Sequence, residues 1–582
     1  MHNVFIAIGG TGAKAAEAVV RLLGLGFPTR TLSSTGGGGK ESDLVTSAGE
    51  SLEIWRLDPD RSSGASAALQ ESIKDYRELQ EHIGSIDKED VAHSGWSMSL
   101  DTKVRHLDPL QLSAAIGSAK KDARTLKQIL DSGGAGKRSA KAFLDAFYEE
   151  KELDVDVTKG FYQKPFIGAA VMAIYAKTLE DENSPGGSTC RIRSFDGKQA
   201  RFFLCGSLHG GTGASGVPIM GKFLSDLRAR RTGTRLADRP WKIGAALLAP
   251  YAIPHDPPFQ TIPEDQVTPE TIDQYFRNYT NHPAFSDVAN EEKPELIKQI
   301  LLGFYADPKD MVNRSRQSLL YYKEHVATHF DHLYLIGKPE PDVLKAEGWS
   351  NGGKNQKNPL NSAEVVAALS ALRFFSDPRP ADRDHYTLAT GKDNLDSSKL
   401  RLQDLPMYRI WKGEHERIEV DPERVLLATG ILHHLITRQI PWDLKAKTWS
   451  GIEGLRKRYL ADESKKDVDA QHLKAAAGLL AKFVNALLSE GQTTGWDKQD
   501  EVGLSRLLSD NQSHVDEITS KIGRRYLIGP KLDAKDHLLL GESTIRVSGA
   551  EFGRWFPAGV ESFTRGDYLR LVWSNLFTKP NE

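Results

Sequence analysis

The sequence predicts an α/β protein with a doubly wound, mainly parallel sheet, because short apolar runs alternate with helical patterns up to about residue 375. Two of these runs lead straight into a glycine-rich loop and then into a helical stretch. The first is VFIAIGGTGAKAAEAVVRLL at 4–23, and the second is FFLCGSLHGGTGASGVPIMGKFL at 202–224. Strand signals become sparse past residue 376, so we expect a long core helix and a helix-rich C-terminal region after the sheet.

The first 150 residues supply two strands and the helices around them. NVFIAI at 3–8 is typical of a buried strand, and 13–23 has the pattern of a helix rich in alanine and leucine. The glycine- and serine-rich stretch 32–51 is typical of a loop or an insertion. LEIWRLDPD at 52–60 is a strand that ends in two acids, and 68–150 is polar and mainly helical.

The middle of the chain continues the alternation. A turn at 159–168 precedes a helix, and KIGAALLAPYAIP (242–254) and FDHLYLIG (330–337) are predicted strands. The proline-rich, acidic stretch 255–312 has the composition of an insertion, and 362–375 is a strongly apolar helix. The expected segments are a sheet domain at 1–361 with insertions near 30–50 and 255–312, a core helix at 362–376, a linker at 377–405, and a helix-rich domain at 406–582.

Composition and charge exclude several classes of protein. Of the 582 residues, 39% are hydrophobic and 26% are charged, which is ordinary for a protein with buried cores. The net charge of -2 gives no indication of a nucleic-acid partner. Cys190 and Cys205 are too few for a disulfide framework, and no apolar run reaches the ~18 residues of a membrane span. The chain opens on a strand-like run instead of a signal peptide, so we expect a cytoplasmic protein.

A glycine loop between a buried strand and a helix suits a phosphate group. Glycine allows the backbone to approach a ligand closely, and the helix start offers free N–H groups. The Walker pattern is not met by GGGGKES or by GGAGKRS, which lack its first glycine and its hydroxyl. The dinucleotide fingerprint fits Gly10-x-Gly12-x-x-Ala15 loosely, but the nearest strand-end acid, Asp58, lies 46 residues past Gly12 instead of ~20.

HGGTGASGVP resembles the signature of the tubulin/FtsZ superfamily, in which GGTG is followed by small residues and then proline. The order of the motifs is also similar: a glycine loop, an acid-bearing loop, a turn before a helix, the GGTG loop and a long apolar helix. The resemblance covers about residues 1–376 and is strongest to the divergent bacterial tubulin-like proteins. It implies a filament-forming, cytoskeletal GTPase that binds GTP or GDP with Mg²⁺. GTP is favoured over ATP only because it is the usual ligand of the family.

The resemblance also implies a set of nucleotide contacts, mostly through backbone N–H groups. In the two glycine loops these are Gly9, Gly10, Thr11, Gly12, Ala13 and Lys14, and Gly210, Gly211, Thr212, Gly213 and Ala214. The Thr212 hydroxyl would be an extra donor. The residues implied to lie near the phosphates or Mg²⁺ are Asp58, Asp60 and the turn from Lys164 to Gly168. The residues implied to contact the base and ribose are Asn313, Asn358 and Asn361.

Some residues depart from the family pattern or have a plainer explanation. Lys14 stands where the family usually has asparagine, and His209 and Ser215 replace glycines of the signature. The two acids of LDPD also suit an ordinary solvated turn, Asn313 suits a helix cap, and Asn358 before proline suits a turn. The spacing of His325, His329 and His332 does not meet a zinc motif, so we expect no protein metal site.

Hydrolysis in this superfamily depends on an acidic loop from the next subunit. The segment SDPRPADRDHY after the core helix offers Asp377, Asp382 or Asp384 for that role. A solvated, proline-broken linker is the plainer interpretation of the same segment. Two other functions stay open: a non-hydrolysing, nucleotide-gated scaffold for partner proteins, for instance in bacterial defence, and a dinucleotide-dependent oxidoreductase.

Overall fold

The computed structural model describes most of residues 2–376, with gaps of which the longest are 25–32, 35–43, 86–101, 109–124, 132–145, 181–191, 232–240 and 344–358. Beyond residue 376 it describes 384–389, 408–412, 416–420 and seven helical positions between 472 and 487. Among the helices described, none combines the length and the hydropathy needed to cross a membrane.

The centre of the fold is a seven-stranded sheet in which every neighbouring pair of strands is parallel. Its strands are β1 (His2–Ile8), β4 (Ser51–Leu57), β5 (Lys103–Leu107), β6 (Ala200–Ser207), β7 (Trp241–Leu248), β9 (His332–Gly337) and β11 (Asp384–Ala389). All eight residues of β6 are buried, as expected for a parallel strand covered on both faces. The prediction of an α/β fold with an open parallel sheet is confirmed.

The strand order, β11-β9-β7-β6-β1-β4-β5, shows how the chain winds. The chain starts at β1 and builds outward through β4 to β5. It then returns to β6 on the other side of β1 and continues outward through β7 and β9 to β11. The direction of winding therefore reverses between β1 and β6, which is the position where open α/β sheets bind ligands beyond the carboxyl ends of their strands.

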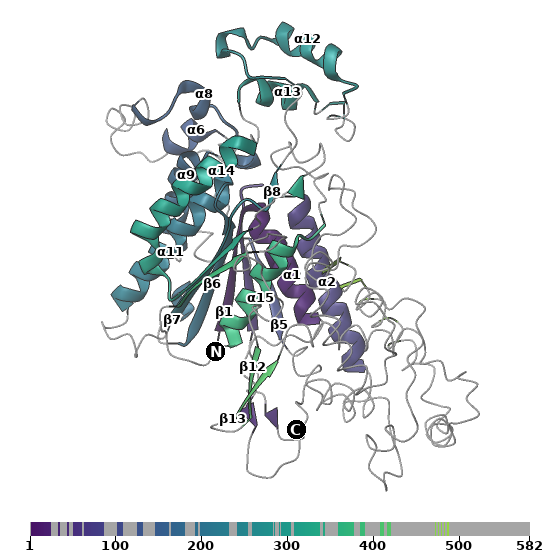
Figure 1. The fold of residues 1–582 in the computed structure, drawn as a ribbon, viewed down its shortest axis with the longest axis vertical. Coiled ribbons are helices and arrows are strands. Elements are labelled where there is room, and N and C mark those ends of the chain that lie inside the picture. The colour runs from purple at the N-terminus through teal and green to yellow at the C-terminus, as the bar shows by residue number, and fades with distance from the viewer. Residues whose placement is uncertain are drawn as a thin grey trace, which may run out of the picture.

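Helices cover both faces of this sheet (Figure 1). On one face α1 (Gly9–Gly24) packs against α2 (Gly64–Ser85) and α15 (Ser362–Ser376), and on the other α9 (Pro165–Glu180) packs against α11 (Gly211–Arg231), with α14 (Pro308–Tyr321) nearby. The core helix expected at 362–376 is α15. Shorter helices, α6 (Leu126–Asp131) and α8 (Glu150–Leu153), lie beside α9.

The stretch expected to be an insertion near 255–312 contains a small core of its own. Helices α12 (Pro269–Tyr279) and α13 (Lys293–Leu301) lie at the top of the molecule in Figure 1. Phe259 packs against the rings of Tyr275 and Tyr279, with ring centroids 4.8 and 5.0 Å apart. This aromatic cluster is separate from the main core beside the sheet.

Three segments differ from the sequence prediction. Within 68–150, which was expected to be polar and mainly helical, Lys103–Leu107 forms β5 and pairs with β4 at the edge of the sheet. Residues 384–389 form β11 and join the sheet beside β9, inside the stretch expected to be a linker. In the region expected to be helix-rich, β12 (Tyr408–Lys412) and β13 (Glu416–Val420) form an antiparallel hairpin. The hairpin pairs with β2 (Ser33–Ser34) and, through it, with β3 (Leu44–Val45). The sequences YRIWK and ERIEV are short runs of aromatic and β-branched residues mixed with charged ones, which is a strand pattern that the helical interpretation missed.

The helical positions between 472 and 487 pack against α1 and α2. Phe483 is fully buried, and its ring lies directly against Gly24. The Lys482 amino group lies 2.7 Å from carboxylate oxygens of both Glu71 and Asp75 on α2. The other helices expected at 406–582 lie outside the described residues.

Candidate functional site

The two glycine loops meet at the carboxyl edge of the sheet, where the winding reverses. Helix α1 starts at Gly9, directly after β1, and α11 starts at Gly211, shortly after β6. Gly9 has φ +71°, a conformation that favours glycine, and a Cβ atom placed on it would lie 3.1 Å from Cβ of Thr212. The loops that the sequence singled out 200 residues apart thus approach so closely that no side chain fits between Gly9 and Thr212 without a shift.

Most of the loop glycines are required by packing within the protein. A Cβ atom on Gly12 would lie 2.5 Å from the carbonyl oxygen of Cys205, and one on Gly213 would lie 2.5 Å from the backbone nitrogen of Ser207. One on Gly211 would lie 2.8 Å from Cβ of Phe161. Gly10 differs, because a Cβ atom there would meet no atom within 4 Å. Gly10 therefore presents the open face of the paired loops.

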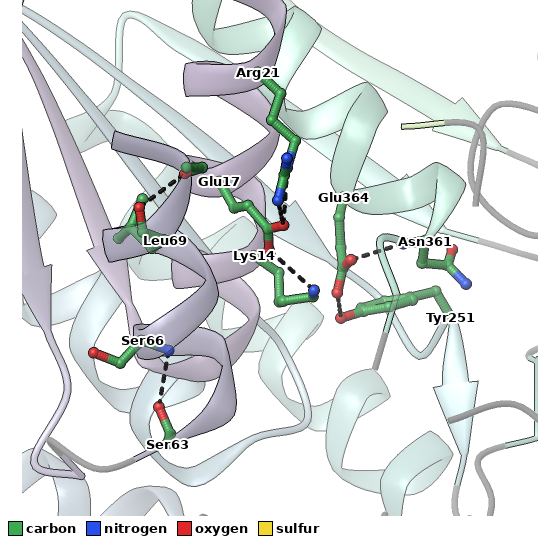
Figure 2. Close-up of polar contacts among 10 residues, drawn as sticks. Lys14, Glu17, Arg21, Ser63, Ser66, Leu69, Tyr251, Asn361 and Glu364 are labelled. Atoms are coloured by element: carbon green, nitrogen blue, oxygen red, sulfur yellow. Dashed lines mark hydrogen bonds and ion pairs between the residues drawn. The ribbon is translucent and has the colours of Figure 1, made fainter. Parts of the chain in front are cut away.

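The two helix starts supply the groups that an anion needs. The first N–H groups of a helix have no carbonyl partner within it, and they lie at the positive end of the helix dipole. Two such starts, of α1 and α11, converge here, and a third helix, α2, starts from the loop after β4. In α2 the hydroxyl of Ser63 already accepts the N–H of Ser66, at 3.2 Å, as a helix cap (Figure 2).

Asp58 and Asp60 lie beside the first glycine loop. The register between β1 and β4 pairs Ile8 with Leu57, so Asp58 follows the strand directly next to the start of α1. Both acids are buried, which corrects the interpretation of a solvated turn, although the Asp60 N–H does donate to Oδ1 of Asp58 at 3.1 Å. Burial raises the pKa of Asp58 to about 7, although the guanidinium of Arg56 partly opposes this effect.

A buried ionic cluster runs along α1 from the glycine loop (Figure 2). The Glu17 carboxylate accepts from Lys14 at 3.0 Å and from two nitrogens of Arg21 at 3.0 and 2.8 Å. Burial opposes ionisation of Glu17, but the two cations hold its pKa below the usual range. The Lys14 amino group therefore already has an anionic partner within the protein.

A second polar cluster joins α15 to the loops after β1 and β7. The Tyr251 hydroxyl donates to Oε1 of Glu364 at 2.7 Å (Figure 2). It also lies 3.4 Å from the hydroxyl of Thr11. The backbone N–H of Asn361 donates to Oε2 of Glu364 at 2.8 Å, and Oδ1 of Asn361 accepts from the N–H of Ala363 at 3.1 Å. These reciprocal bonds cap the start of α15.

This arrangement changes the role expected of Asn361 and adds Glu364, which sequence reasoning did not single out. Burial raises the pKa of Glu364 to about 7, against the attraction of Lys14. Asn361 was expected to read the base or ribose, but its side-chain carbonyl caps a helix and the residue is fully buried. The pattern Asn-x-x-Glu before an apolar run is a readable capping signal that could have identified both residues.

His209 is the functional candidate that sequence reasoning recorded only as a departure from the signature. The residue is 8% exposed, and among the described residues its Nδ1 atom has no hydrogen-bond partner. Its ring lies edge-on to Tyr251, with centroids 6.4 Å apart. Burial lowers its pKa to about 4, so the imidazole is neutral near pH 7.

Of the remaining predicted site residues, the turn from Lys164 to Gly168 lies against the second glycine loop, and the others lie away from the paired loops. The Lys164 amino group is 2.9 Å from Oε1 of Glu152. Gly168 packs α9 against the start of α11, where a Cβ atom on it would collide with the Ser215 hydroxyl and lie 2.9 Å from the carbonyl oxygen of Gly211. Asn313 is exposed and lies inside α14, which begins at Pro308 and not at Asn313 as expected. Asp384 is the first residue of β11 and thus lies at the amino edge of the sheet, opposite the glycine loops.

Three further predicted residues, Asn358, Asp377 and Asp382, lie outside the described residues. Within the part of the chain that the structure does describe, no group of three or more histidine, cysteine, aspartate or glutamate side chains is arranged to hold a metal ion. A divalent cation at Asp58 and Asp60 would therefore need further oxygen ligands from a bound phosphate or from water, as Mg²⁺ commonly does.

Comparison with known proteins identifies no relative of this chain: no family model matches it, and neither does any curated protein. The function is therefore inferred from the geometry of the paired loops and from the motif resemblance.

Proposed function

We propose that this chain binds a nucleoside triphosphate or diphosphate at the paired glycine loops, with GTP favoured over ATP, in the manner of the tubulin/FtsZ superfamily. The observation that carries the proposal is the contact between the two loops at the reversal point of the sheet. A Cβ atom on Gly9 would lie only 3.1 Å from Cβ of Thr212, and two helices of 16 and 21 residues start from the same edge. Phosphates commonly bind at such convergent helix starts.

The residues around the loops fit a magnesium nucleotide. Backbone N–H groups of α1 and α11 would hold the phosphates, and the open face of Gly10 is where a ligand could approach the backbone most closely. Asp58 and Asp60 would face the cation. A bound cation would favour the ionised form of Asp58, whose pKa burial has raised.

The same proposal includes hydrolysis on self-assembly. Asp384 begins β11 at the amino edge of the sheet, whereas the glycine loops lie at the carboxyl edge. In a head-to-tail stack, the amino edge of one copy would lie over the glycine loops of the next, and such a contact repeats into a filament. A carboxylate supplied in this way would orient the attacking water, with Mg²⁺ and the loop amides stabilising the phosphoryl oxygens.

Binding is best tested at Gly10. Gly10→Val adds a branched side chain on the open face, where it meets no protein atom, so the fold should be retained while calorimetry shows loss of GTP and GDP binding. Gly10→Ala is the matched smaller variant and should weaken binding less. Gly211→Val is a poorer test, because its Cβ atom would collide with Phe161 even without ligand. Unchanged nucleotide affinity in Gly10→Val would refute the proposal.

Hydrolysis is tested by a dilution series. Assembly-coupled catalysis requires that turnover per subunit rise with protein concentration and disappear when Asp377, Asp382 and Asp384 all become asparagine. The matched control is Asp273→Asn, at a half-exposed carboxylate of α12. Turnover that is absent while nucleotide stays bound would identify the non-hydrolysing scaffold instead.

One observation supports a second candidate, a dinucleotide-binding oxidoreductase. The spacing of 46 residues between Gly12 and Asp58 argued against it, but the sheet places Asp58 at the end of the strand next to β1, where the dinucleotide fold carries its ribose-binding acid. Calorimetry with NAD and NADP beside GTP and ATP separates the candidates. The second glycine loop favours the nucleoside phosphate, because the dinucleotide fingerprint uses only the first.

A further inference from the structure

His209 is a buried polar side chain with an unused hydrogen-bonding atom at the proposed site. It immediately precedes Gly210 and is 8% exposed, and its Nδ1 atom has no partner among the described residues. Leaving such an atom unpaired in the interior costs stability, so in a folded protein it calls for an explanation. Packing alone does not need the nitrogen, since phenylalanine has a ring of similar shape.

The backbone on both sides of His209 is fixed. The N–H of Leu208 donates to the carbonyl oxygen of Leu248 at 2.8 Å, and the hydroxyl of Ser318 donates to the carbonyl oxygen of Leu208 at 3.1 Å. The N–H of Gly210 donates to the hydroxyl of Ser207 at 3.2 Å. The backbone that carries the imidazole is therefore held by strand β7, helix α14 and its own turn, as the backbone of a ligand-contacting residue should be.

The surroundings of His209 join three loops of the site. Its ring lies edge-on to Tyr251, with an interplanar angle of 64°. The Tyr251 hydroxyl in turn reaches Glu364 of α15 and Thr11 of the first glycine loop. His209 thus lies in a cluster of hydroxyl and carboxyl groups, beside the backbone amides proposed to hold the phosphates.

The chemistry of the side chain indicates which part of a nucleotide it would contact. A phosphate is best bound by cations and N–H donors, and the two helix starts already provide the donors. A neutral imidazole offers one donor and one acceptor, which matches a hydroxyl group that both accepts and donates. We propose that His209 recognises a sugar hydroxyl of the bound nucleotide, and so makes the site select ribonucleotides over deoxyribonucleotides. This inference rests on the proposed function.

The test compares sugar preferences in three proteins by calorimetry, with GDP, 2′-deoxy-GDP and 3′-deoxy-GDP as probes and the corresponding adenine nucleotides in parallel. The wild-type chain should bind a ribonucleotide about three- to tenfold more tightly than at least one deoxy counterpart, the factor that one hydrogen bond supplies. His209→Phe, which keeps the ring, should abolish that preference. His209→Asn places a polar atom close to the position of Nδ1 and should restore it in part.

The matched control is His329→Phe, on the turn before β9 at the opposite edge of the sheet, which should leave the preference unchanged. Thermal melting of each variant shows whether it is folded. A His209→Phe protein that keeps the wild-type sugar preference overturns the inference, as does a wild-type protein with no preference. An effect of His209→Phe that grows from GDP to GTP and ignores the sugar would assign the imidazole to phosphate. If the wild-type chain binds no nucleotide, the proposed function fails as well.

Discussion

Glu364→Gln should stabilise the protein at alkaline pH and change little at acidic pH. Glu364 is 3% exposed, and burial raises its pKa to about 7 from the ordinary 4.5. Because the folded-state pKa of this acid is the higher one, the folded chain keeps a proton that the unfolded chain releases between pH 4.5 and 7. The free energy of unfolding therefore falls as the pH rises through that window, and the penalty is complete above pH 7.

The magnitude follows from the two pKa values. Their difference, at 1.36 kcal/mol per pKa unit, corresponds to about 3 kcal/mol as an upper value. Glutamine removes the titration and keeps the hydrogen bonds: its carbonyl can accept from the N–H of Asn361, and its amide can donate to the oxygen of Tyr251. The variant should thus gain up to about 3 kcal/mol over wild type between pH 4.5 and pH 8.

Urea unfolding of both proteins at pH 4.5 and pH 8 gives the difference between their free energies of unfolding at each pH, and the change in that difference should be up to about 3 kcal/mol. Glu264→Gln, at an exposed position in the short helical turn before α12, controls for the loss of one negative charge. A stability difference that is the same at both pH values would refute the reasoning, because Glu364 would then be ionised throughout. If Glu364→Gln destabilises the protein more at pH 8 than at the acidic pH, then Lys14 lowers the pKa of Glu364 by more than burial raises it.

Three further predictions concern packing and charge near the site, and urea unfolding measures each of them. Glu17→Gln leaves two buried cations with a neutral partner and should cost about 3 kcal/mol; a loss under 1 kcal/mol would show that the cluster is solvated. Gly211→Ala should destabilise the chain by about 1–3 kcal/mol through the contact with Phe161, whereas Gly10→Ala should be neutral or stabilising, and equal effects would contradict the assignment of Gly10 as the open position. Phe483→Ala should cost about 3 kcal/mol, and no change would mean that the segment around it does not contribute to the α1–α2 face.

The sheet and its glycine loops could be predicted because they depend on local signals. Long apolar runs such as VFIAI and FFLCG are buried on both faces in a parallel sheet, and a glycine loop marks each strand-to-helix turn. The site residues on neighbouring loops were harder to identify. Tyr251, Glu364 and Thr11 meet only because β7, α15 and β1 converge at one edge of the sheet, and no spacing in the sequence encodes that contact.

The asparagine predictions were weaker for a physical reason. Asparagine suits helix caps and turns as well as base recognition, so a single asparagine before a helix does not distinguish these roles. Asn361 caps α15 through its side-chain oxygen, and Asn313 is exposed inside α14. The strand β11 was missed because DHYTLA is short and follows a proline-broken, acidic stretch, and it is its pairing with β9 that makes it part of the sheet.

The glycine pattern alone does not establish a ligand site, since the fold accounts for most of it. Gly12 and Gly213 are needed because α1 and α11 start so close to the strand ends that a Cβ atom would collide with backbone. A ligand is favoured by features that close packing of the loops does not require, namely the raised pKa values of two buried acids and a buried nitrogen left unpaired within the described part of the chain. Asp58 and Glu364 are buried acids with pKa values of about 7, and the Nδ1 atom of His209 is buried without a partner among the described residues. Each of these features lowers the stability of the fold, and all three occur at one edge of one sheet, which is the distribution expected where a protein gives up stability for binding.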